Sequence, residues 1–111
     1  PLRFHRRFER FKRQFAVDIT SQYMRLLQSA NTIENEKANY MALQATASEN
    51  RALGEAGRIA RTDVERANQS ELAGEVRLIR ARQQHANDKD QFLISLGLPP
   101  DAYFEVDPAD V

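Results

Sequence analysis

Apolar and small residues recur at alternating steps of three and four positions through the first half of the chain, which is typical of a coiled-coil seam. No glycine or proline interrupts residues 2–53. One extra four-residue step, Phe15–Ile19–Tyr23, is a stutter that locally unwinds the supercoil. We predict a helix over about residues 3–54, with Lys37 and Gln44 filling two seam positions. The other seam residues are Phe4, Phe8, Phe11, Phe15, Ile19, Tyr23, Leu26, Ala30, Ile33, Tyr40 and Ala47.

A second helix is predicted over about residues 62–96, and it carries two apolar stripes that lie about one position apart. One narrow seam suffices for a two-helix hairpin, so the broad face indicates a further neighbour. Gly74 disfavours the helix by about 1 kcal/mol relative to alanine, and we expect a neighbouring backbone to approach closely there. The stripes are Leu72, Val76, Ile79, Ala86 and Leu93, and Val64, Ala67, Gly74, Leu78, Ala81, Phe92 and Leu96.

Residues 55–61 separate the two helical patterns and are predicted to form a tight reversal. Gly54 precedes it and Gly57 lies within it, and glycine supplies the left-handed conformation that ends many helices. Thr62 stands three residues before Glu65, the spacing of a capping box. Asp63 adds negative charge to the first turn of the second helix, where the helix dipole favours it.

The predicted fold is therefore all-α: a long antiparallel two-helix coiled-coil hairpin over residues 1–97, followed by a short non-helical tail. Gly97 and the prolines after it end the second helix. Leu96 should lie opposite about Tyr23, so the first helix overhangs the second by about five turns. Residues 98–111 are acidic and contain no basic residue. We expect this acidic tail to pack back on the overhang.

The composition limits the possible functions. The chain has 111 residues, 16 basic and 16 acidic, and no cysteine, so disulfides and thiolate metal sites are excluded. Its longest run of large apolar residues, Phe92-Leu93-Ile94, is too short to span a bilayer. No signal peptide is visible, and the start at Pro1 suggests a processed or excised piece. His5 and His85 have no suitably spaced metal partners, and no phosphate-binding loop appears. We expect no enzymatic activity and no cofactor.

Six basic residues crowd the first 15 positions beside the four phenylalanines, with Glu9 as the single acid. A membrane-surface or partner-binding amphipathic helix has this composition. A seam stripe with a solvated basic flank has it as well, and the acidic tail supplies the complementary charge. Nucleic-acid binding is disfavoured, because no nucleic-acid-binding motif accompanies the charge.

Two segments resemble the TolC family of outer-membrane efflux proteins. Residues 55–67, EAGRIARTDVERA, are similar to the family's hairpin tip, where a glycine is followed by Asp-Val and then by an alanine three residues further on. Residues 81–99, ARQQHANDKDQFLISLGLP, resemble the helix end before the family's Leu-Gly-Leu-Pro stop. The resemblance covers about residues 50–101, and the first helix matches only in kind.

The resemblance implies a trimer whose hairpins assemble into a long α-helical tunnel for efflux or type I secretion. This segment would form part of the periplasmic portion of an outer-membrane protein in a Gram-negative-type bacterium. The hairpin tips would dock a periplasmic adaptor (membrane fusion) protein, which links the tunnel to an inner-membrane pump. The implied docking residues are Ala56, Gly57, Arg58, Ile59 and Ala60.

Thr62 and Asp63 match the place where the family ties neighbouring hairpins together to close the tunnel. Two residues depart from the family pattern: Glu65 replaces a usual leucine, and Arg58 replaces a common apolar residue. The alternative function is a free-standing coiled-coil scaffold or adaptor that binds a partner or a membrane surface through its basic, Phe-rich start.

Overall fold

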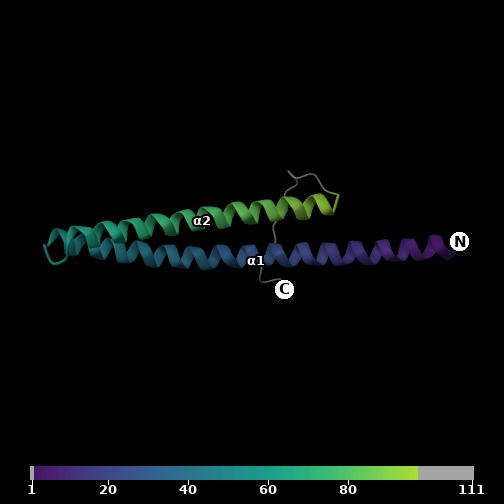
Figure 1. Cartoon of the computed structure of the whole chain (residues 1–111), viewed down its shortest axis with the longest axis horizontal. Helices are drawn as coiled ribbons and strands as arrows, with labels where there is room; N and C mark the ends of the chain where they lie inside the picture. Colours follow the sequence, from purple (N-terminus) through teal and green to yellow (C-terminus); the bar gives the residue numbers. More distant parts are fainter. Residues whose placement is uncertain (1, 98–111) are drawn as a thin grey trace.

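The computed structural model describes residues 2–97, which form two helices joined by a short reversal (Figure 1). Helix α1 comprises Leu2–Glu55 and helix α2 comprises Arg61–Ser95, and no strand occurs between residues 2 and 97. The helices run antiparallel in a rod that measures 83 × 24 × 21 Å. The predicted all-α hairpin is confirmed. The predicted position of the acidic tail, residues 98–111, lies outside the described residues.

The contacts between the helices form one seam along the whole of α2. Its inward positions follow steps of three and four from Val64 to Ser95, and Ala67, Gly74 and Leu78 are among the buried ones. They belong to the second of the two predicted stripes. In the other stripe, Leu72, Val76 and Ile79 are 60%, 37% and 47% exposed, whereas its last member, Leu93, is buried. Alpha-helical geometry puts these three residues on the side of α2 away from α1.

In the part of α1 that α2 covers, the predicted seam is wrong at two positions. Lys37 and Gln44 are exposed, and the residues one position earlier, Glu36 and Leu43, face α2 instead. The predicted seam positions and the observed ones both alternate in steps of three and four. Only the observed positions place Leu43 against the other helix. Glu36 enters the seam because Arg77 supplies an opposite charge, with Nε 3.4 Å from Glu36 Oε2.

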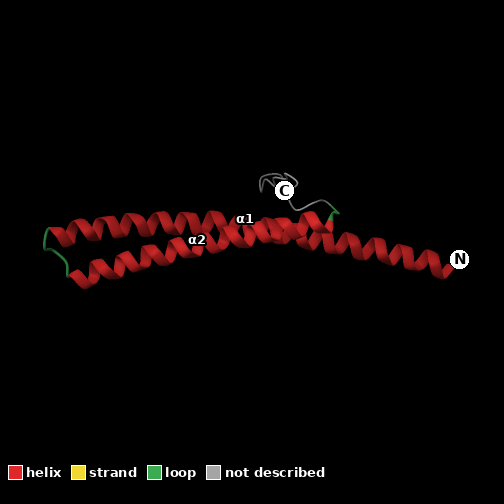
Figure 2. Ribbon diagram, turned by 90° about the horizontal axis from the view of Figure 1, so that it is seen from above, coloured by secondary structure: helices red, strands yellow, loops and turns green. Residues whose placement is uncertain are grey.

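Polar and aromatic contacts at the open end of the hairpin establish its register. Ser95 Oγ donates a hydrogen bond of 2.6 Å to Gln22 Oε1, and the rings of Tyr23 and Phe92 lie 5.8 Å apart. These contacts lie within a few positions of the predicted Tyr23–Leu96 alignment. Toward its N-terminus, α1 continues past the end of α2 (Figure 2).

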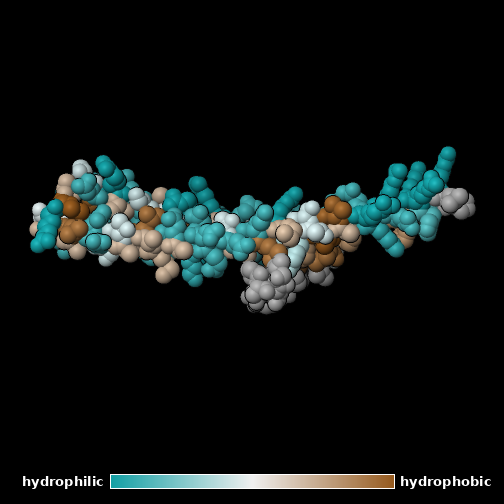
Figure 3. All heavy atoms as spheres, turned by 90° about the horizontal axis from the view of Figure 1, so that it is seen from below, coloured by the Kyte–Doolittle hydropathy of each residue, from teal (hydrophilic) through white to brown (hydrophobic). Residues whose placement is uncertain are grey.

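We define the overhang as residues 2–18 of α1, and the side chains of residues 3–18 are exposed. Its four phenylalanines are 48% to 80% exposed. On the face seen in the space-filling view, this end of the rod is a largely hydrophilic projection, and apolar atoms gather both near the reversal and where the projection begins (Figure 3). The two ends of the rod thus differ in surface chemistry.

The two helices approach closely at Gly74, as its position in the middle of α2 predicts. A Cβ atom built on Gly74 would stand 2.6 Å from Leu43 Cδ1 and 3.7 Å from Tyr40 Cα. The first distance is below van der Waals contact, so the space beside Gly74 is already filled by α1. The lost helix propensity, about 1 kcal/mol, is offset by this packing.

We therefore predict that Gly74→Leu lowers the free energy of unfolding by about 1–3 kcal/mol, because the new side chain overpacks the seam. The neighbouring Ala73 is exposed, and Ala73→Leu should change the same quantity by less than about 0.5 kcal/mol. Urea unfolding followed by circular dichroism, at one protein concentration, measures both. Equal losses for the two variants would contradict close packing at Gly74.

Candidate functional site: the hairpin tip

The reversal between the helices, which we call the tip, comprises Ala56, Gly57, Arg58, Ile59 and Ala60. Helix α1 ends in a Schellman motif: Arg58 N–H donates to Leu53 O at 2.9 Å and Gly57 N–H donates to Gly54 O at 3.1 Å. Gly57 has φ +70°, in the left-handed region that favours glycine. Gly57 therefore ends α1 and turns the chain, as its position in the sequence predicts.

Gly54, the other glycine of the predicted break, is still helical and has a different role. A Cβ atom at Gly54 would stand 2.6 Å from Val64 Cγ2. The absence of a side chain at Gly54 therefore lets the first turn of α2 lie against the last turn of α1. One glycine shapes the turn and the other allows the two helices to meet beneath it.

Helix α2 begins without the predicted capping box. Its N-cap is Ala60, with φ −70° and ψ 150°, and no side chain caps the helix. Thr62 is exposed and already inside the first turn, so it lacks the extended backbone that an N-cap requires. Glu65 does not reach back to Thr62, because its carboxylate lies 3.4 Å from Arg61 Nε.

The tip is largely solvent-exposed, as a docking surface must be. Ala56, Gly57, Arg58 and Ala60 are exposed, and Ile59 is half-buried. Nothing lies within 4 Å of the position where Gly57 would carry a Cβ atom. The exposed part of the tip therefore consists of three small residues and one cation, with the apolar Ile59 turned partly inward.

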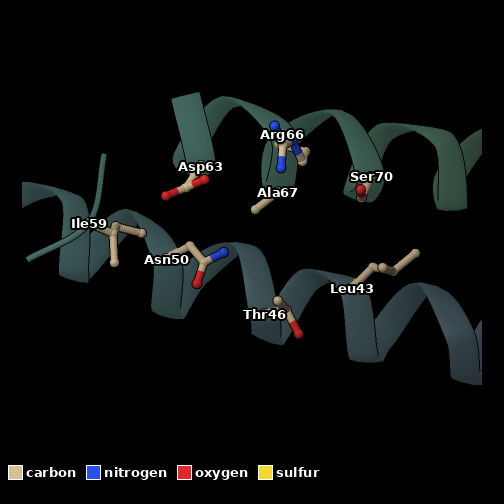
Figure 4. A pocket seen from close by; sticks show the side chains of 8 residues that line it. All are labelled: Leu43, Thr46, Asn50, Ile59, Asp63, Arg66, Ala67 and Ser70. Atoms are coloured by element: carbon tan, nitrogen blue, oxygen red, sulfur yellow. The ribbon is translucent and has the colours of Figure 1, made fainter. Parts of the chain in front are cut away.

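Ile59 lines an open groove of about 440 Å³ that extends from the tip along one side of the hairpin (Figure 4). Asp63 and Ile59 lie at the tip end of this groove, and Leu43 and Ser70 lie at its far end. Asp63, one of the two residues implied to tie neighbouring hairpins, is exposed. The remaining lining residues are Thr46, Asn50, Arg66 and Ala67.

A second groove, of about 370 Å³, flanks the tip on the other side of the seam. Here Arg51 Nη1 donates to Asn68 Oδ1 at 2.8 Å and lies 3.8 Å from Glu71 Oε1. None of these three residues is among the site residues predicted from the sequence. The sequence does contain an indication of this contact. Arg51 and Asn68 immediately follow seam positions, and at such positions the charged and polar residues of paired helices meet. The second groove is lined by Arg51, Gly54, Glu55, Arg61, Val64 and Asn68.

The two histidines are far apart along the rod and in different settings. His5 Nε2 lies 3.4 Å from Glu9 Oε1 on the exposed overhang, and His85 Nδ1 lies 3.1 Å from Ser29 Oγ within the seam. Between residues 2 and 97, no three histidine, cysteine or acidic side chains gather into a group that could hold a metal ion. Neither described helix is long and apolar enough to cross a membrane.

No protein-family model, curated protein or solved structure matches this chain significantly. The function proposed below therefore depends on the residues of the chain and their geometry.

The observed cap of α2 predicts that Ala60→Ser raises the free energy of unfolding by about 0.5–2 kcal/mol. The serine hydroxyl would accept a hydrogen bond from the N–H of residue 62 or 63. Thr62→Ala should change stability by less than about 0.5 kcal/mol, because Thr62 makes no capping bond. Urea unfolding of the two variants beside the unmodified chain measures both effects. Destabilisation by Thr62→Ala of 1 kcal/mol or more would instead support a capping box.

Proposed function

We propose that this chain is a periplasmic hairpin of a TolC-like outer-membrane channel for efflux or type I secretion. In this proposal the rod forms part of the tunnel wall, and its tip docks a periplasmic adaptor protein that connects the tunnel to an inner-membrane pump. The observation that carries the proposal is the exposed reversal Ala56–Ala60 at the end of a long antiparallel hairpin. The assembly would be trimeric, and the role is structural rather than enzymatic.

The two motifs that resemble the family coincide with two backbone features. Between residues 2 and 97, only Gly57 and Gly97 have positive φ, at +70° and +78°. Gly57 is the glycine of the tip motif, and Gly97 is the glycine of the Leu-Gly-Leu-Pro motif. Each follows the end of a helix, where left-handed glycine is favoured. This coincidence supports the resemblance, since each glycine has a conformational reason for its position.

The chemistry of the tip fits docking against another narrow helical tip. Ala56, Gly57 and Ala60 are small, so a partner backbone can approach closely, and Arg58 offers guanidinium donors to a carboxylate or carbonyl of the adaptor. Arg58 stands where an apolar residue is common in the family. An adaptor matched to this chain would therefore carry a polar or acidic group at the contact.

The outer stripe, Leu72, Val76 and Ile79, supports the tunnel-wall part of the proposal. These residues lie on the side of α2 opposite the seam, where a second hairpin would pack in a wall of adjacent hairpins. Asp63, exposed at the tip end of its groove, is proposed to tie one hairpin to the next. Thr62 is exposed beside Asp63 and is proposed to contribute to the same tie.

We predict that the chain self-associates through the outer stripe at micromolar concentration. Replacing Leu72 and Ile79 together by glutamate should weaken association by tenfold or more. The reason is that the apolar surface buried on association is lost, which reduces the free energy of association by about 1.5–3 kcal/mol. Replacing Gln69 and Gln83 by glutamate adds the same charge to the same side of α2 and serves as the matched control. Sedimentation equilibrium measures the constants, and a monomeric unmodified chain would contradict the prediction.

The tip itself is tested by site-specific crosslinking in the full-length channel protein. The chain contains no cysteine. After any cysteine elsewhere in the full-length protein is replaced, a single Arg58→Cys substitution is labelled with a maleimide photocrosslinker. We expect a periplasmic adaptor protein, identified by mass spectrometry, as the crosslinked product. Gln83→Cys, exposed far from the tip along α2, is the control and should give no such product. No adaptor at position 58, or equal yields at both positions, would overturn adaptor docking by the tip.

A further inference from the structure

The phenylalanine stripe of the overhang continues the helix–helix seam of the hairpin. Each phenylalanine stands eighteen residues, or about five helical turns, before a residue that faces α2. Phe8 is thus aligned with Leu26, which is fully buried, and Phe11 is aligned with Ser29, which contacts His85. The stripe therefore points toward the side of α1 on which α2 lies. Phe4 and Phe15 stand the same interval before Gln22 and Ile33.

Between residues 2 and 97, no second helix lies beside the stripe. Helix α2 ends at Ser95, which is hydrogen-bonded to Gln22, so the 17 residues of the overhang extend past it by about 25 Å. The side of the space beside the stripe that faces α1 is apolar, and the end of α2 closes it at one end. A second helix in line with α2 would occupy the same position relative to the overhang that α2 occupies relative to the rest of α1.

The charges around the stripe select the partner. Six cations and one carboxylate lie between residues 3 and 15. Arg7 immediately precedes Phe8 and Lys12 immediately follows Phe11, so these two cations flank the stripe on opposite sides. Lys12 Nζ lies 4.7 Å from the centre of the Phe8 ring. In paired helices, the charges at such flanking positions determine which partner helix binds, because opposite charges attract and like charges repel.

Two other occupants fit less well. A second copy of the overhang would bring Arg7 and Lys12 against the same cations, and like charges at flanking positions oppose pairing. A flat membrane surface is hindered by α2, which projects on the same side of α1 with a diameter of about 10–12 Å. The phenylalanines also span an arc of only about 60°, narrower than the apolar face of a typical surface helix.

We infer that the overhang is a binding site for an acidic amphipathic helix of a partner protein. This helix lies in line with α2, places apolar residues at steps of three and four against the phenylalanines, and carries Asp or Glu beside Arg7 and Lys12. About four to five turns cover the overhang. The sequence of residues 98–111 contains three prolines, which is not the composition of an uninterrupted amphipathic helix of four to five turns. The inference is independent of the proposed channel function, because it concerns the opposite end of the rod.

The test uses the full chain and fluorescent helical peptides of three heptads, with leucine at the seam positions. One peptide carries glutamate at the flanking positions and the other carries lysine. Fluorescence anisotropy should show binding of the glutamate peptide, with at least tenfold weaker binding of the lysine peptide. Equal binding of the two peptides, or no binding of either, would overturn the inference.

Matched variants of the chain locate the site. Replacing Arg7 and Lys12 together by glutamate should weaken binding of the glutamate peptide by about tenfold, since exposed attractive pairs become repulsive. Replacing Arg6 and Arg13 by glutamate makes the same change in net charge on the far side of the overhang. This control should have a distinctly smaller effect. Equal losses for the two variants would reduce the interaction to non-specific attraction and overturn the inference.

Two further measurements separate the other occupants. A synthetic peptide of residues 98–111 that binds the chain as tightly as the glutamate helix would assign the site to the chain's own acidic segment. The chain is also sedimented with vesicles of phosphatidylglycerol and phosphatidylcholine. If the chain binds these vesicles and does not bind the glutamate peptide, the overhang is a membrane-binding site. Phe8→Ser with Phe11→Ser should abolish peptide binding while circular dichroism shows unchanged helicity. Retained binding by this variant would also overturn the inference.

Discussion

The whole rod depends on a single antiparallel seam that is narrow and rich in small residues. Leu26 and Leu93 are the largest fully buried side chains between residues 2 and 97, and Ala47, Ala67 and Ala81 are also buried there. Small seam residues bring two helix backbones close, so that each remaining apolar side chain loses more of its contact with water. Stability rises with buried apolar area. Because a narrow seam buries little of it, each close approach contributes a large share of the free energy of unfolding.

A seam of similar small residues does not by itself specify one register, because sliding a helix by one heptad keeps small residues opposite small residues. Polar contacts within the seam make such a shift unfavourable. Ser29 Oγ lies 3.0 Å from Leu26 O in its own helix and 3.1 Å from His85 Nδ1, so the Ser29–His85 hydrogen bond joins the two helices. Sliding α2 would leave His85, Glu36 and Gln22 without these partners. Buried polar groups in coiled coils specify alignment in the same way.

The length of the hairpin and the place of its turn follow directly from the sequence. Helix α1 runs for 54 residues because nothing between residues 2 and 53 disfavours a helix, and it ends where Gly57 adopts positive φ. The phase of the seam is harder to predict. Glu36 and Lys37 are both charged, so periodicity alone does not choose between them. The apolar Leu43, beside the polar Gln44, is the residue that indicates the observed phase.

The predicted start of α2 is correct to within one residue, but the predicted capping box is absent, because a local motif does not include its three-dimensional setting. Thr62 and Glu65 have capping-box spacing, but the Schellman turn at Gly57 brings the chain back onto α1 within a few residues. Val64 then packs beside Gly54, which requires the helix to be established by Arg61. Tertiary contact thus outweighs a capping preference of about 1 kcal/mol. The grooves beside the tip also depend on tertiary contacts, since they exist only where two correctly aligned helices meet.

The same alignment separates the surfaces of the rod that are open to partners. The tip and the overhang are at opposite ends of a molecule 83 Å long, and the outer stripe of α2 lies between them on the side opposite the seam. Charges this far apart in solvent are screened, because the separation is many times the Debye length of about 8 Å at physiological ionic strength. Binding of a partner at one end can therefore affect the other end only by changing the packing of the seam. A rod with one continuous seam can hold partners at both ends at once, at a separation determined by the length of α1.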